Sequence, residues 1–296
     1  MWGEELIYFG ADPVMLQVGS FSLRWYGTFL TLAVVWVIFW MWLQVKKGAQ
    51  ISLDTLLSGT LVAIPSGLIF ARLLHVIDDI VIASLHPELA DSGKVINYLQ
   101  HPVLIIGGEG LTIWGAILGA VLGVWIYFKV AKIKGGYIFD LLAPACILAQ
   151  AIGRLGCLFN GCCYGTPTTL PWGLVYTDPQ SFGFTNGVPC QPTVAYEIVY
   201  CVIIFVVLLM LRKKLKPNGS LFMLYLALYA VWRLGIDFLR DGTPFLFGLH
   251  QAQIISVIVL LITVPWMIIH TRWVKKNTQT PPASDKIEPN KSSPAV

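Results

Sequence analysis

Five arginines lie at or near the ends of long apolar stretches, where an ionised side chain is costly: Arg24, Arg72, Arg154, Arg233 and Arg240. Arginine in such a segment usually faces a protein interior or a watery cavity and marks function. Its guanidinium binds phosphate oxygens through paired N–H donors. A group of these residues at one membrane surface would suit the anionic head group of a phospholipid. The alternative for each residue is that it only reaches toward the interface and pairs with bulk lipid.

The strongest motif is GRLGCLFNGCCYG, at residues 153–165, which combines four glycines with Arg154 and Asn160. Glycine allows a backbone to bend or to approach a ligand closely, so we expect the helix to be interrupted here. Irregular backbone at membrane depth is tolerated where it is buried in protein or lines a cavity. The alternative is a tight helix-to-loop turn without a ligand.

A second motif, YAVWRLGIDFLRDG at 229–242, spaces Arg233, Asp237 and Arg240 by four and three residues. This spacing predicts one helical face. An Asp paired with one Arg keeps both ionised and leaves the second cation for a ligand. The alternative is a structural ion pair between helices.

Two weaker motifs stand at the starts of apolar runs. LRWYG at 23–27 places Tyr26 near an interface, where Trp and Tyr commonly form an aromatic belt. EGLTIWGAILG at 109–119 contains Trp114 and small residues every few positions. Small residues of that kind usually let helices pack closely.

The elements that must position these residues are membrane helices. The chain has 296 residues, of which 56% are apolar and 12% charged, with a mean hydropathy of +0.71. A soluble domain carries about twice that charged fraction. Seven runs are long enough to cross a bilayer as helices, at 26–43, 56–76, 111–130, 138–158, 195–211, 219–239 and 252–270. We therefore predict an all-α polytopic membrane protein with seven transmembrane helices.

Basic residues predict the orientation of these helices. Clusters of Lys and Arg follow the first, third, fifth and seventh runs, at 46–47, 129–134, 212–216 and 272–276, and the alternate loops hold a single lysine, Lys94. The positive-inside rule then places the N-terminus outside and the C-terminus in the cytoplasm, with all five arginines toward the outer face. No basic segment precedes an early apolar stretch, so internal helices are expected to direct insertion. We expect one membrane domain over 1–276 and a disordered cytoplasmic tail over 277–296.

Six cysteines are present, and four of them fall near the predicted outer face: Cys157, Cys162, Cys163 and Cys190. In an oxidising compartment a disulfide is one alternative, with Cys163–Cys190 and Cys157–Cys162 as possible pairs. The other is that these thiols stay unpaired. Their spacing does not match a common zinc motif and no histidine is close in sequence, so no metal is expected.

Together the four motifs resemble one family, the prolipoprotein diacylglyceryl transferases of bacterial inner membranes, over about residues 13–275. The family signature G-R-x-G-N-x-x-N-G-E-x-x-G is similar to 153–165, with matches at Arg154, Gly156, Asn160, Gly161 and Gly165. Its R-W-Y-G matches 24–27, its Y-x-x-x-R-x-x-x-E-x-x-R is similar to 229–240 with Asp237 for Glu, and its H-P-[ST]-x-x-Y-E is similar to 191–197.

Four positions depart from the family pattern. Trp114 stands where the family has a histidine, Cys157 where it has an asparagine, Cys162 where it has a glutamate, and Gln191 where it has a second histidine. The phosphate-facing arginines are present, so the resemblance supports lipid binding more directly than it supports catalysis.

The resemblance implies transfer of the diacylglyceryl group of phosphatidylglycerol to the lipobox cysteine of a preprolipoprotein signal peptide, with glycerol phosphate leaving. It implies a multi-pass protein of the bacterial cytoplasmic (inner) membrane, in contact with membrane lipid, with no cofactor and no nucleic acid partner. The implied catalytic residues are Arg154, Arg233 and Tyr26. The implied substrate-binding residues are Asn160, Arg240, Asp237, Gly156, Cys157 and Trp114.

The base that ionises the acceptor thiol is left open by the sequence. His75 and His250 are near the predicted outer face, and a field of arginines could instead lower the pKa of the thiol. Two other functions are also left open. One is a divergent paralogue that binds phospholipid but uses another acceptor or none. The other is a transporter of an anionic solute, for which inverted repeats or paired broken helices are expected; neither is found at matching positions in the two halves of the sequence.

Overall fold

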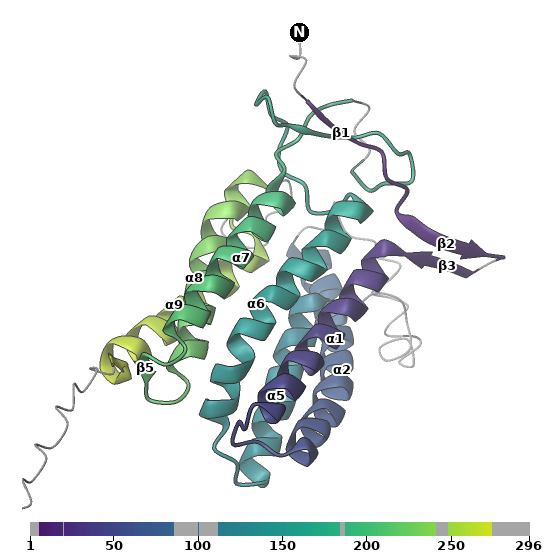
Figure 1. Ribbon diagram of the computed structural model, residues 1–296. Helices are drawn as coiled ribbons and strands as arrows, with labels where there is room; N and C mark the ends of the chain where they lie inside the picture. The colour runs from purple at the N-terminus through teal and green to yellow at the C-terminus, as the bar shows by residue number, and fades with distance from the viewer. Residues whose placement is uncertain are drawn as a thin grey trace, which may run out of the picture.

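The computed structural model describes residues 6–19, 21–85, 100, 112–183, 187–240 and 248–273 (Figure 1). Within these ranges, the side chains of Phe21, Ile82, Ala83, Ile113 and Trp114 are not described. The predicted tail over 277–296 lies outside the described residues.

Long helices dominate the structure: α1 (Trp25–Lys46), α2 (Leu53–Leu85), α5 (Ile113–Val130), α6 (Gly135–Asn160), α7 (Thr193–Leu211), α8 (Ser220–Ile236) and α9 (Gln251–His270). Six of them are long and apolar enough to cross a membrane, and α5 contains a shorter apolar helix. Each coincides with one of the predicted runs, which confirms the helical polytopic architecture. Prolines inside α2 and α6, Pro65 and Pro144, do not end either helix.

Short strands tie together segments that are distant in sequence. β1 (Ile7–Phe9) pairs in parallel with β4 (Leu174–Tyr176), and β2 (Val14–Val18) pairs with β3 (Phe21–Arg24). β5 (Leu215–Lys216) pairs with β6 (Arg272–Trp273). The paired strands β1 and β4 lie on the same side of the bundle, and the four helices α1, α2, α5 and α6 come between them in the chain. An even number of these helices must therefore cross the membrane. All four crossing it meets this requirement, so α5 is expected to cross despite its shorter apolar stretch.

Helices α2 and α5 pack through glycines, as the spacing of small residues predicts. A Cβ at Gly115 would lie 2.3 Å from the Phe70 carbonyl oxygen, and one at Gly119 would lie 2.4 Å from the Phe70 Cβ. At Gly123 it would lie 2.3 Å from the Ser66 hydroxyl. The three glycines recur every four residues on one face of α5, so the two backbones approach closely.

Helix α6 is central to the bundle and packs against α1, α7 and α8. Its buried residues Ala143 and Ile147 form a core with Cys201 and Leu208 of α7 and Leu221 of α8. Asp140 of α6 also caps α8: its carboxylate accepts the backbone N–H groups of Gly219 (2.7 Å) and Phe222 (2.9 Å). A carboxylate at a helix N-terminus satisfies otherwise unpaired donors and complements the helix dipole.

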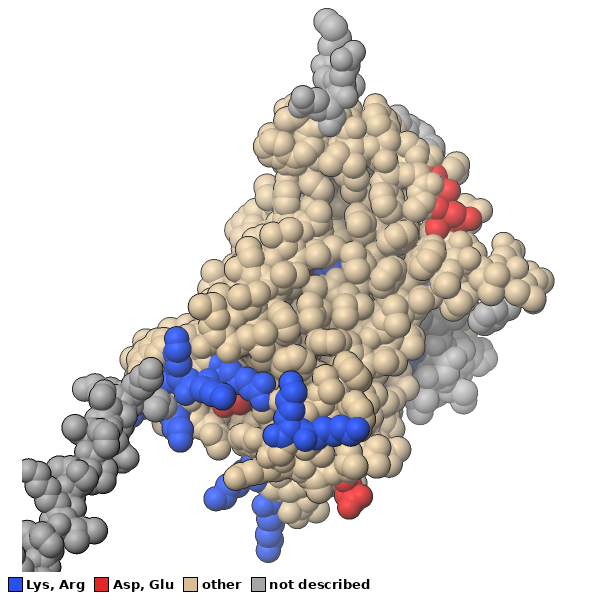
Figure 2. Space-filling view, in the orientation of Figure 1, with Lys and Arg blue, Asp and Glu red and all other residues tan. Residues whose placement is uncertain are grey.

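Charge is divided between the two ends of the bundle. Figure 2 shows Lys and Arg gathered at the end away from β1, where the connections α1–α2, α5–α6 and α7–α8 lie. Large apolar side chains such as Leu61, Leu261 and Ile268 are exposed between the ends. That pattern suits a helix bundle surrounded by lipid. Which end faces the cytoplasm stays a prediction.

Candidate active site

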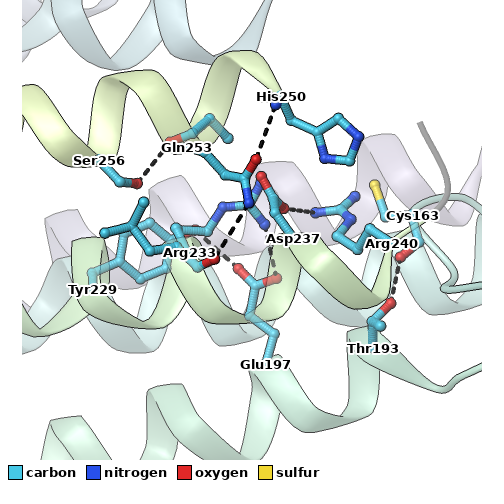
Figure 3. Close-up of polar contacts among 12 residues, drawn as sticks. Cys163, Thr193, Glu197, Tyr229, Arg233, Asp237, Arg240, His250, Gln253 and Ser256 are labelled. Carbon is cyan, nitrogen blue, oxygen red and sulfur yellow. Dashed lines mark hydrogen bonds and ion pairs between the residues drawn. The ribbon is translucent and has the colours of Figure 1, made fainter. Parts of the chain in front are cut away.

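A buried carboxylate on α7, that of Glu197, joins three helices near the end of the bundle where β1 lies. Its Oε1 lies 2.8 Å from Nη2 of Arg154 on α6 and accepts a hydrogen bond of 2.9 Å from the Tyr229 hydroxyl on α8. Its Oε2 lies 3.7 Å from Nη1 of Arg233, also on α8 (Figure 3). The side chain of Glu197 is only 2% exposed. Glu197 therefore fixes the position of both guanidiniums.

Sequence reasoning assigned Glu197 no role, although a signal was present. It is the one acidic residue in the apolar stretch 193–211. An ionisable side chain inside a membrane segment is a functional candidate on that ground alone. The contacts of Glu197 with Arg154 on α6 and with Tyr229 and Arg233 on α8 could not be predicted from the sequence.

A second buried carboxylate, Asp237, holds the remaining arginine of this group. Its Oδ1 lies 2.9 Å from Nη2 of Arg233 and 3.9 Å from Nη1 of Arg240. The predicted pairing of Arg233 with Asp237 is thus confirmed. Helix α8 ends at Ile236, earlier than predicted, and a 3₁₀ turn over Asp237–Leu239 still keeps Asp237 within reach of both arginines.

The cluster of Arg154, Arg233, Arg240, Glu197 and Asp237 is cationic. Its three guanidiniums face two carboxylates, which leaves one net positive charge. Arg233 is 6% exposed, and its Nε and Nη1 have no hydrogen-bond partner among the described residues. Buried donors of this kind are costly unless a ligand satisfies them. The cluster is therefore suited to an anion with oxygen acceptors.

The end of α6 brings three thiols to the same place. Gly161, at φ +66°, takes the left-handed conformation that ends the helix, and Cys162 N–H then donates back to the Cys157 carbonyl at 3.1 Å. This is the helix ending that glycine favours, and it places the residue after the glycine next to the last turn. The sulfurs of Cys157, Cys162 and Cys163 lie within 4.8 Å of one another.

No disulfide joins the cysteines in the part of the chain that the structure describes, so the disulfide alternative, Cys163–Cys190 or Cys157–Cys162, is wrong for this structure. Close contact among the thiols separates their acidities. The pKa of Cys163 is lowered by hydrogen bonds from Cys157 and Cys162 and by Arg240 and Arg154, whereas the pKa of Cys162 is raised by its contact with Cys157. Of the three thiols, Cys163 is the one whose pKa these contacts lower.

Helix α1 contributes the opposite wall of the site. A Cβ at Gly156 would lie 3.1 Å from the Tyr26 Cα, so α6 and α1 are in close contact here. Tyr26 is near enough to Arg154 and the three thiols to interact with them electrostatically. Nη1 of Arg24 donates to the side-chain amide oxygen Oδ1 of Asn160 at 3.5 Å. The structure thus brings Tyr26, Gly156, Cys157 and Asn160 together with Arg154.

Of the other residues singled out in the sequence, Arg72 and His75 lie on α2, outside this group. The Trp114 side chain is outside the described residues. Arg72 is buried in α2, which packs mainly against α5. His75 pairs with Asp79 on α2 at 3.7 Å. His250 caps the start of α9, where its backbone N–H donates to the side-chain oxygen of Gln253 at 3.0 Å, and Figure 3 shows it on the Arg240 side of the cluster.

Gln191, at the position of a family histidine, has a structural role. Its amide donates to the Thr168 hydroxyl at 3.2 Å and accepts from Tyr196 at 3.3 Å. Nearby, the Thr193 hydroxyl donates to the Cys163 carbonyl at 2.8 Å. These bonds hold the segment after α6 in place, and with it the thiols.

Comparisons with known proteins identify the family. The sequence pattern of the prolipoprotein diacylglyceryl transferase family matches residues 13–269. A phosphatidylglycerol–prolipoprotein diacylglyceryl transferase of Dehalococcoides mccartyi is 43% identical over 270 residues, covering 90% of this chain and 98% of the relative. One of Clostridioides difficile is 31% identical over 268 residues, covering 90% and 97%. The chain therefore belongs to the prolipoprotein diacylglyceryl transferase family.

Proposed function

We propose that this chain transfers the diacylglyceryl group of phosphatidylglycerol to the lipobox cysteine of a preprolipoprotein signal peptide. The observation that carries the proposal is the buried cationic cluster, in which Nε and Nη1 of Arg233 make no hydrogen bond to the described residues, although Nη1 lies 3.7 Å from Glu197. In the reaction the acceptor sulfur bonds to the terminal glyceryl carbon. The bond between that carbon and the phosphate oxygen breaks, and glycerol phosphate leaves with the electron pair.

Charge at the phosphate grows during this step. The phosphodiester of the lipid carries one negative charge, whereas a phosphate monoester carries about −1.5 to −2 at neutral pH. The cluster's single excess positive charge balances the lipid, and the additional charge that develops is stabilised by the same donors. Arg154 and Arg233 are the proposed catalytic residues because they would contact the leaving phosphate.

Carboxylates and neighbours hold these groups in place. Glu197 and Asp237 orient the guanidiniums, and Arg240 supports the head group. Tyr26 and Asn160 are proposed to hydrogen-bond the head group from the α1 side, where Gly156 permits the close approach of the two helices. Cys157 and Trp114 are the remaining residues proposed to bind the substrate.

We place the protein in the bacterial cytoplasmic membrane, as one membrane domain over 1–276. The basic end of the bundle faces the cytoplasm by the positive-inside rule, so the cluster lies toward the outer leaflet. This orientation is supported by the gathering of Lys and Arg at the end of the bundle away from β1.

The test uses purified protein in mixed micelles of detergent and phosphatidylglycerol with a lipobox peptide. Release of glycerol phosphate and the mass gain of the peptide are both measured. Arg233→Ala should abolish both, whereas Arg212→Ala, at the basic end of the bundle where it contacts Gln44, should retain them. Substantial turnover by Arg233→Ala would refute its role. Release of glycerol phosphate without peptide modification would favour another acceptor.

A further inference from the structure

The three thiols at the end of α6 are arranged by a backbone that carries strain. Cys163 has φ +65°, a left-handed conformation that is unfavourable for a non-glycine residue. Gly161, two residues earlier, is also left-handed, and a hydrogen bond from Thr193 holds the Cys163 carbonyl. Backbone strain of this kind persists where the surrounding structure enforces it, and it concentrates at functional sites.

The spacing of the sulfurs fits one metal ion. A zinc–sulfur bond of about 2.3 Å in a tetrahedral site places its sulfurs about 3.8 Å apart. The sulfurs of Cys157, Cys162 and Cys163 already lie within 4.8 Å of one another. Cys162 and Cys163 are only partly buried, so rotation of their side chains is the movement by which the sulfurs would close around a metal ion.

The number of ligands matters as much as the spacing. Structural zinc sites have four protein ligands, whereas catalytic zinc sites have three and leave the fourth position for a reactant. Three thiolates with zinc carry one net negative charge, which takes up the single excess positive charge of the arginine cluster, so the lipid phosphate would then be held by the directed N–H donors and not by net charge. Nη1 of Arg154 lies 3.9 Å from the Cys157 sulfur, and Figure 3 shows the Cys163 sulfur on the Arg240 side of the cluster.

The reaction proposed above leaves one requirement open. The attacking group must be a thiolate, because a thiol is a poor nucleophile. Trp114 replaces the histidine of the resembling family, and Gln191 is committed to Thr168 and Tyr196. The alternative bases are His75, which lies beside Asp79 on α2, and His250, which Figure 3 shows on the Arg240 side of the cluster. A metal that binds the acceptor sulfur meets the requirement without a base, because a thiol that coordinates zinc is deprotonated outright.

We propose that Cys157, Cys162 and Cys163 bind one zinc ion whose fourth position takes the acceptor cysteine of the signal peptide. This inference rests on the proposed function. On binding, the acceptor thiol releases its proton to solvent and its sulfur bonds to zinc. The sulfur then attacks the glyceryl carbon, the carbon–oxygen bond breaks, and glycerol phosphate leaves with the electron pair. The thioether product dissociates from zinc, whose oxidation state is unchanged.

Zinc content tests the site directly. The full chain in detergent is stripped with a chelator, reloaded with zinc, desalted and assayed by elemental mass spectrometry. We expect about one zinc per chain, and at least a tenfold weaker affinity for Cys162→Ser and for Cys163→Ser. Cys146→Ala, in the middle of α6 and away from the trio, is the control and should keep its zinc. Equal zinc in the wild type and in a variant with all three cysteines replaced by serine would overturn the proposal.

Cobalt substitution tests the open position without any variant. Co²⁺ in the wild-type chain should give intense sulfur-to-cobalt charge-transfer absorption, which a lipobox peptide increases and a peptide with serine in place of its cysteine does not. Absence of this absorption overturns the site, and an unchanged spectrum with the cysteine peptide overturns the role of the fourth position.

The two proposals can fail separately. Full transferase activity in chain stripped of zinc would overturn the metal inference and leave the proposed function intact. A zinc site that binds the peptide sulfur while no glycerol phosphate is released would overturn the proposed function and leave the site intact.

Discussion

Replacing Glu197 by glutamine keeps the shape of the side chain and removes its charge. The 2.8 Å ion pair with Arg154 is then lost, and the excess positive charge of the cluster rises from one to two. Breaking a buried pair by neutralising one partner costs about 3–5 kcal/mol, because the other charge stays buried. Arg154 is 17% exposed, so the lower end, about 3 kcal/mol, applies. At roughly 2 °C per kcal/mol for a chain of this size, the unfolding midpoint should fall by about 6 °C.

The assay is thermal unfolding in detergent, followed by tryptophan fluorescence. Asp54→Asn is the matched control, since this carboxylate is exposed in the first turn of α2, and its midpoint should shift little. Tyr229→Phe removes one hydrogen bond to Glu197 but keeps both ion pairs, so it should cost only about 1 kcal/mol. A Glu197→Gln midpoint within about 1 °C of the wild type would refute the view that this carboxylate holds the arginines.

Three further predictions concern packing, capping and the turn at the site. Gly119→Ala should lower the unfolding midpoint, because its Cβ would lie 2.4 Å from a side-chain carbon of α2, whereas Gly59→Ala, with open space around it, should not. Asp140→Asn should cost about 1 kcal/mol and speed hydrogen exchange at the start of α8, measured by mass spectrometry; unchanged exchange there would contradict its capping role. Gly161→Ala places a Cβ 1.8 Å from the Ser181 hydroxyl, at a position with left-handed backbone. Both the unfolding midpoint and the transfer activity should therefore fall. Wild-type values for both would contradict the view that this turn requires glycine.

The helices were predictable because each is encoded locally. An apolar run long enough to cross a bilayer is visible in the sequence, and all seven predicted runs became helices. The pair of Arg233 and Asp237 was predictable for the same reason, since residues four apart meet on one turn.

Contacts between helices were not predictable from local pattern. Glu197 meets Arg154 and Tyr229 only because α6, α7 and α8 lie side by side, and sequence spacing does not encode that arrangement. Asp140 reaches the start of α8 for the same reason. The three thiols are an intermediate case. Gly161 indicated the turn that returns Cys162 toward Cys157, but nothing in the sequence indicated a left-handed Cys163.

The parallel pairing of β1 with β4 has a consequence for how the protein is made. Ile7 pairs with Leu174, a residue that leaves the ribosome 167 positions later. The first strand must therefore stay without its partner strand β4 while α1, α2, α5 and α6 are synthesised after it. Phe9 packs against Phe159 and Tyr176, so nascent chains stalled before β4 would leave this aromatic contact incomplete. The contacts between β1 and β4 should therefore form late in synthesis, after α6 has entered the bilayer.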